Sequence, residues 1–185
     1  SLLRSPTTAD VADATTLSDL DMALHQAHAA LDAGVRASVG TSIFDWASMS
    51  SDASYNQETA NAVSSASTSL MSAIKAVRAS IALEESITAQ ADLSTQLDEA
   101  RLVYEQNNGK VSDASTVTAL SDAIGSAEQT AALDVNVTAA SIYQDATNSL
   151  SVACEKVESS HTDWQAAQEA AAAAAGRASA ARYSS

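Results

Sequence analysis

One segment of this chain occurs twice, and this duplication limits the fold more than any other feature. Residues 11–31 read VADATTLSDLDMALHQAHAAL, and residues 111–131 read VSDASTVTALSDAIGSAEQTA, an ungapped offset of 111 − 11 = 100. A second echo follows each copy and aligns Leu70 with Leu150, an offset of 150 − 70 = 80. Repeats of this kind are typical of stacked supersecondary units rather than of one catalytic domain.

Apolar residues recur in both copies every three or four positions, which is the period of an amphipathic helix. This pattern places Leu120 and Leu150 in the core, with Leu20 and Leu70 as their mates in the first copy. Residues 57–107 contain neither Pro nor Gly, which predicts one long helix or two helices joined end to end. We therefore predict an all-α fold, an elongated array of three-helix-bundle repeats joined by a long shared helix.

The same pattern divides the chain into four segments. These are a flexible lead (1–9), an incomplete first helical repeat (10–82) with an aromatic insertion (35–56), a second three-helix repeat (83–160) and an Ala-rich C-terminal helix or tail (161–185). Thr8 or Asp10 is expected to cap the first helix, and Gly34 to end it. Asp113 is expected to cap the corresponding helix of the second repeat.

Composition excludes several classes of partner. The formal net charge of −14, from 23 acidic and 9 basic residues, repels nucleic acid and anionic membranes, which recruit Lys and Arg. No stretch approaches the roughly 20 apolar residues that span a membrane. Aromatic residues are only 4% of the chain, so thin alanine-rich helical layers are expected rather than a thick core. We expect neither nucleic-acid binding nor membrane insertion.

No catalytic or cofactor motif is readable in the sequence. Cys154 is the only cysteine, and we expect it to act as a small buried hydrophobic residue. The neighbouring carboxylates Asp98 and Glu99 point apart on a helix, so they do not form a catalytic pair. We expect no cofactor and no enzymatic activity.

Four potential metal ligands share one face of the first helix: Asp21, His25, His28 and Asp32. Two histidines and two carboxylates are ligand types that zinc accepts. Their mates in the second copy are Ser121, Gly125, Glu128 and Ala132. Because the repeat does not preserve the ligand set, we favour a solvated polar stripe and assign no metal.

The insertion at residues 35–56 has no counterpart in the second copy and gathers aromatic side chains. Phe44, Trp46 and Tyr55 are the candidate ligand contacts, because aromatic residues anchor interfaces and stack on sugars. The alternative, which we favour, is that the insertion folds back and caps the open end of the first bundle.

Residues 115–157 carry a Ser/Thr start, an L..AI..A pattern around Leu120, a linker, and a second apolar pattern around Leu150. This resembles the last two helices of a FIVAR repeat ("found in various architectures"). Residues 91–106 would be the first helix of that repeat, and residues 11–33 and 59–81 the last two helices of a preceding copy. The insertion after Gly34 departs from the family pattern.

The resemblance implies a non-catalytic helical spacer or binding module of a secreted or cell-surface protein of a Gram-positive bacterium. Such a module positions neighbouring domains of the same polypeptide or binds host or cell-wall glycan or protein. Two alternatives stay open at this point. One is a coiled-coil regulatory segment of a cell-wall hydrolase, and the other is an independent enzyme.

Overall fold

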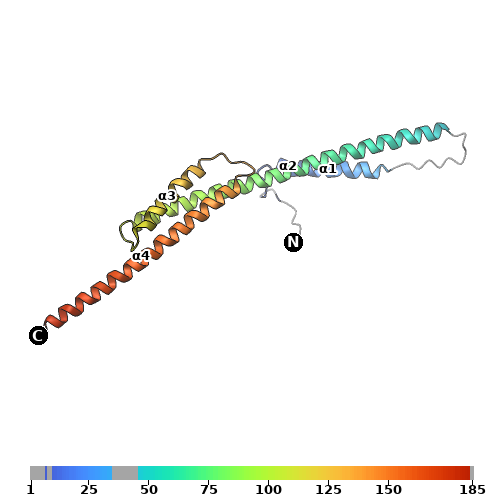
Figure 1. Cartoon of the computed structure of the whole chain (residues 1–185). Coiled ribbons are helices and arrows are strands. Elements are labelled where there is room, and N and C mark those ends of the chain that lie inside the picture. The colour runs from blue at the N-terminus through green and yellow to red at the C-terminus, as the bar shows by residue number, and fades with distance from the viewer. Residues whose placement is uncertain (1–6, 8–9, 35–45, 184–185) are drawn as a thin grey trace. The chain divides into compact units, whose positions relative to one another are not determined.

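The computed structural model describes residues 7, 10–34 and 46–183, and within the last range it describes the side chains of residues 49–179. This part of the chain is all-α and contains no strand, as the sequence predicted (Figure 1). Its helices are α1 (Thr15–Asp32), α2 (Trp46–Asn107), α3 (Ala114–Ala131) and α4 (Ala140–Tyr183).

Two compact units divide the chain, and α2 contributes to both. Unit 1 (Ser1–Glu84) holds α1 and the first part of α2, whereas unit 2 (Glu85–Ser185) holds the rest of α2 with α3 and α4. The long breaker-free stretch is thus a single 62-residue helix, and it begins at Trp46, inside the predicted insertion.

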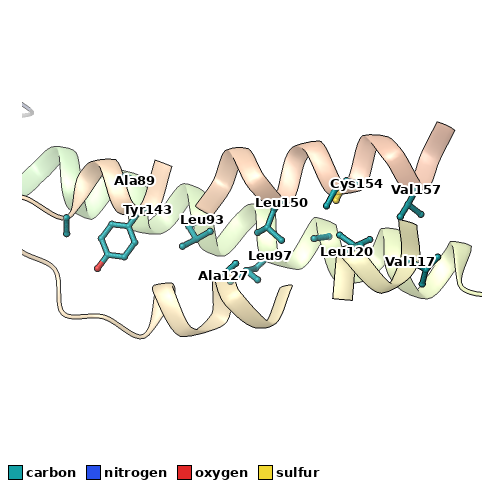
Figure 2. Close-up of a cluster of buried hydrophobic side chains, with 13 residues drawn as sticks. Ala89, Leu93, Leu97, Val117, Leu120, Ala127, Tyr143, Leu150, Cys154 and Val157 are labelled. Carbon is teal, nitrogen blue, oxygen red and sulfur yellow. The ribbon is translucent and has the colours of Figure 1, made fainter. Parts of the chain in front are cut away.

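Unit 2 is built around one hydrophobic core to which three helices contribute (Figure 2). Leu93 of α2, Leu120 of α3, and Leu150 and Val157 of α4 are fully buried in it. The predicted core positions Leu120 and Leu150 are therefore confirmed. Burying a leucine stabilises a fold by roughly 1.5–3 kcal/mol, so these few large side chains dominate the packing of an otherwise alanine-rich unit.

The buried face of α4 differs from the sequence prediction at one residue. Ile142 keeps the four-residue spacing to Ala146 and Leu150 but is exposed, and Tyr143 is fully buried instead. Tyr143, Leu150 and Val157 are spaced by seven residues, close to two helical turns, so they share one face of α4. The ring of Tyr143 can be buried because its hydroxyl donates a hydrogen bond to the carbonyl of Leu133 at 2.9 Å.

In unit 1, α1 packs against the first part of α2 in the antiparallel direction. At one end the backbone N–H of Asp13 donates to the hydroxyl of Ser80 at 2.8 Å. At the other end the hydroxyl of Tyr55 donates to the carbonyl of Ala33 at 2.8 Å. These two contacts fix the register of the helix pair.

Helix α1 begins later than predicted. Its first residue is Thr15, so Asp10 is not its cap, and Thr8 lies outside the described residues. The carboxylate of Asp13 accepts hydrogen bonds from the N–H and the hydroxyl of Thr15 at 2.9 and 2.7 Å. It thereby satisfies one of the free N–H groups at the start of the helix. Asp113 caps α3 as predicted, because its carboxylate accepts a backbone N–H at 2.9 Å.

The other helix ends follow local rules. Gly34 directly follows the C-cap of α1 and has φ +63°, a left-handed conformation that glycine adopts without strain. Gly109 plays the same part after α2 with φ +77°. Helix α4 continues past the unit 2 core as far as Tyr183, and its alanine-rich residues 165–179 are exposed.

Candidate functional site

Both units contain the same hydrogen-bonded joint, at positions that the two sequence offsets relate. In unit 1, the hydroxyl of Ser80 accepts the N–H of Asp13 at 2.8 Å, and the carbonyl of Ser80 accepts the N–H of Ala12 at 3.2 Å. In unit 2, the hydroxyl of Ser160 accepts the N–H of Asp113 at 2.9 Å, and the carbonyl of Ser160 accepts the N–H of Ser112 at 3.1 Å. Both serines are buried. The joint ties the segment before α1 or α3 to its antiparallel partner helix.

Sequence reasoning missed this joint although a signal for it was present. Ser80 and Ser160 are identical residues at the offset of 80, three positions beyond Val77 and Val157. A buried serine hydroxyl needs a hydrogen-bond partner, and the aspartate backbone of each repeat supplies one. The identity of these two serines therefore carries structural information beside that of the valines three positions before them.

The aromatic candidates are only partly described. Phe44 lies outside the described residues, and Trp46 is the first residue of α2, with a side chain that also lies outside them. Tyr55 is half-buried in α2, and its hydroxyl donates to the carbonyl of Ala33. In unit 2 the carbonyl of Leu133, the mate of Ala33 at the offset of 100, accepts the hydroxyl of a tyrosine from α4. Tyr55 thus closes the end of α1 as that tyrosine closes the end of α3.

The polar stripe of α1 is held by local contacts. His25 Nδ1 lies 2.9 Å from the carbonyl oxygen of Asp21 and 3.5 Å from its carboxylate, and both side chains are exposed. His28 and Asp32 follow on the same exposed side of the helix. Over the residues that the structure describes, no group of three or more His, Cys, Asp or Glu side chains is placed to hold a metal ion.

Cys154 is buried in the unit 2 core. Burial raises the pKa of its thiol, and the nearby carboxylates of Glu158 and Glu99 raise it further. A nucleophilic cysteine needs the opposite environment, one that stabilises the thiolate. The position therefore suits a packing residue.

A small charge cluster bridges α2 and α3 in unit 2. Arg101 of α2 contacts Glu128 of α3 at 2.7 Å and Asp98 of its own helix at 3.0 Å. The hydrogen bond that the Arg101 guanidinium donates to Glu128 raises the pKa of Arg101, which stays charged in any case. The contact lies on the surface, so it contributes more to the register of the two helices than to stability.

Each antiparallel helix pair has a shallow groove along one side, lined by small polar and apolar side chains. In unit 1 it has a volume of about 500 Å³, and its lining includes Gln26 of α1 and Ser69 of α2. In unit 2 a groove of about 360 Å³ includes their mates, Ser126 and Ser149. The two grooves therefore overlap in position, and each lies open along its helix pair.

The other side of each pair is apolar, and here the two units differ. In unit 2 it is covered by residues 85–107 of α2, which we call the covering segment, and Leu120 and Leu150 are fully buried beneath it. In unit 1 their mates Leu20 and Leu70 are only half-buried. The apolar face of unit 1 consists of Leu17, Leu20, Leu24 and Leu31 of α1 with Leu70 and Ile74 of α2.

Exposure is greatest along the outer edge of this apolar face. Leu24 is 46% exposed and Leu31 is 65% exposed. Their mates in unit 2, Ile124 and Ala131, are partly buried against the core. Their three-to-four spacing with Leu20 is typical of a buried stripe, and they are exposed because no described segment stands where the covering segment stands in unit 2.

Comparison of the chain with protein-family models, with curated proteins and with solved structures finds no match. Within the described residues, no helix has both the length and the apolar character needed to cross a membrane.

Proposed function

We propose that this chain is a non-catalytic helical spacer and binding module, in which an incomplete first repeat and a three-helix second repeat form an elongated array joined by α2. It belongs to a secreted or cell-surface protein of a Gram-positive bacterium, as the resemblance to FIVAR repeats implies. There it positions neighbouring domains of the same polypeptide and binds a glycan or protein ligand.

The observation that carries this proposal is the single helix α2, which contributes to both units. A 62-residue helix corresponds to about 93 Å at a rise of about 1.5 Å per residue. The hydrogen-bonded joint recurs where each antiparallel partner helix attaches, so the two units repeat one local design. A repeated attachment along one helix suits a spacer, since each unit supports the helix locally.

The non-catalytic part of the proposal rests on the chemistry of the described side chains. The one cysteine has a raised thiol pKa in an apolar core, which disfavours a nucleophile. Asp98, one member of the acidic pair, contacts Arg101 on the surface rather than facing a second carboxylate across a cleft. The described grooves are shallow and lie along helix pairs.

A distance measurement across α2 tests the spacer function. Spin labels would be placed at Asn61→Cys and Glu105→Cys, both exposed, in a Cys154→Ala background. The two sites are 105 − 61 = 44 residues apart, which gives about 66 Å along a continuous helix. We expect one narrow distance distribution near that value in pulsed dipolar spectroscopy.

Inserting Gly-Gly-Ser-Gly between Glu84 and Glu85 supplies the matched control, because glycine in a helix interior breaks its continuity. This insertion should broaden the distribution. If the parent chain already gives a broad or double distribution, α2 does not hold a fixed length in solution and the spacer proposal is wrong.

A further inference from the structure

The proposed spacer function leaves the apolar face of unit 1 unused. In unit 2 the corresponding face is buried against the covering segment, whose Leu93 and Leu97 lie in one hydrophobic core with Leu120 and Leu150 (Figure 2). Ala89 and Ala100 of the covering segment are also buried, and such small residues let two helix backbones approach closely. Unit 2 therefore displays the kind of element that fits this face.

We propose that the apolar face of unit 1 binds a single amphipathic α-helix of a partner protein. The apolar stripe of that helix repeats the small-and-leucine pattern of Ala89, Leu93, Leu97 and Ala100, and its flank toward α1 is basic. The inference names the class of partner for the binding part of the proposed function, and it rests on that function.

The apolar requirement follows from the spacing of the leucines. Leu17, Leu20, Leu24 and Leu31 are separated by three, four and seven residues, so they share one stripe of α1. The buried residues of the covering segment recur at the same three-to-four spacing. A helix laid along the apolar face of unit 1 would remove Leu24 and Leu31 from water, as helix-in-groove recognition does in general.

The basic flank follows from charge. In unit 2, Arg101 of the covering segment contacts Glu128 at the edge of the apolar side, at 2.7 Å. In unit 1 the matching edge of α1 carries His28, the mate of Glu128, together with Asp21 and Asp32, and α1 contains no Lys or Arg. Lysine or arginine on the partner helix would therefore meet opposite charge along this edge.

A second copy of this chain fits the same face less well. Its exposed α4 residues, aligned at the offset of 80, offer Ala173 and Arg177 where the covering segment has Leu93 and Leu97. Two unit 1 faces packed together would bring two acidic α1 edges against each other, which opposes association. The observations thus favour a separate partner helix.

A synthetic peptide of residues 85–107 with Glu105→Lys tests the proposal. Glu105 and Ser121 line the same surface hollow in unit 2, and the mate of Ser121 in unit 1 is Asp21. Lysine at this position should therefore favour unit 1. We expect saturable binding of the fluorescently labelled peptide to the full chain in anisotropy titrations, and weaker binding as salt is raised.

Two matched variants of the chain place the binding on the apolar face. Leu24→Asp puts a charge on the face at an exposed position and should weaken binding by about tenfold or more, as loss of an interface anchor does. Met22→Asp changes an equally exposed residue whose mate in unit 2 is the exposed Asp122, and it should bind like the parent. A peptide that also carries Leu93→Asp should not bind.

Circular dichroism of each variant checks that the helices persist. If Leu24→Asp loses helix, Leu31→Asp at the still more exposed position takes its place. Absence of saturable binding, or equal binding by the Leu24→Asp and parent chains, overturns the inference. A parent chain that sediments as a dimer and becomes a monomer on Leu24→Asp also overturns it, because a second copy is then the occupant.

The spacer measurement is independent of this test. A narrow distance distribution across α2 without peptide binding overturns only the partner-helix inference. Specific peptide binding with a broad distribution overturns only the spacer function.

Discussion

Leu120 and Leu20 occupy the same position in the duplicated helices, so substituting each by alanine measures what the covering segment contributes. Leu120 is fully buried beneath it, whereas Leu20 is half-buried on the open face of unit 1. Leu→Ala removes three carbon groups, worth about 2.4 kcal/mol at about 0.8 kcal/mol for each buried one. A rigid site adds a cavity cost, which brings the measured range for such substitutions to about 3–5 kcal/mol.

We therefore expect Leu120→Ala to lower the free energy of unfolding by about 3–5 kcal/mol. Leu20→Ala should cost about 1–2 kcal/mol, because part of its surface is already in water and no described segment closes a cavity over it. Urea unfolding followed by circular dichroism gives the totals. Since two units need not unfold together, hydrogen exchange of the α1 and α3 amides assigns each loss to its unit.

The contrast between the two variants is the decisive quantity. Losses of equal size would mean that the covering segment adds no burial at this position. A larger loss for Leu20→Ala would mean that unit 1 is closed in solution by some other element. Either result would refute the comparison of the two faces.

Three further predictions concern the joint, the cysteine and the α3 cap. Ser160→Ala and Ser80→Ala should each cost about 1–3 kcal/mol in urea unfolding, because a backbone N–H then loses its buried acceptor; unchanged midpoints would contradict the joint. Cys154 should react with a bulky maleimide far more slowly in the native chain than in urea, since burial both shields the thiol and raises its pKa; equally fast labelling would show that the core is open. Hydrogen bonds from Ser115 lower the pKa of the Asp113 carboxyl below its ordinary value of 3.8. The carboxylate therefore stabilises the fold fully above pH 3.8, and this stabilisation is lost as the pH falls through the lower pKa of the folded chain. The stability difference between the parent chain and Asp113→Asn should accordingly shrink on acidification, and a constant difference would refute the assignment.

Much of the helical fold could be predicted because it depends on local chemistry. Asp113 precedes α3 and satisfies its first free N–H groups, and Gly34 and Gly109 supply the left-handed residues that end α1 and α2. Leu120 and Leu150 were identified as core residues from their three-to-four spacing. These signals act within a few residues, so a single sequence carries them in full.

Burial and one helix start could not be predicted from local pattern, because they depend on contacts with other parts of the chain. Leu24 has the same local pattern as a buried residue, yet it is exposed because burial at this position requires a third helix, which no described segment of unit 1 supplies. Tyr143 rather than Ile142 is buried, and its hydroxyl donates to the carbonyl of Leu133 in the linker before α4. Helix α1 begins at Thr15, where the carboxylate of Asp13 accepts the N–H of Thr15 while the N–H of Asp13 donates to Ser80. In each case a contact with another part of the chain decides which residue is buried or where a helix begins, and the local pattern alone does not decide it.

The joint is alike in both units, whereas among the described residues a third helix covers the apolar side only in unit 2, and this difference bears on function. The bonds of Ser80 and Ser160 involve only the antiparallel pair, so they have nearly the same lengths whether or not a third helix is present. Unit 1 therefore keeps its two helices in register while its leucines stay exposed. A pair held in this way is already arranged for a third helix, which lowers the ordering cost of binding one. The duplication thus accounts for both parts of the proposed function: the repeated joint supports α2 as a spacer, and the uncovered face of unit 1 supplies a site for a partner.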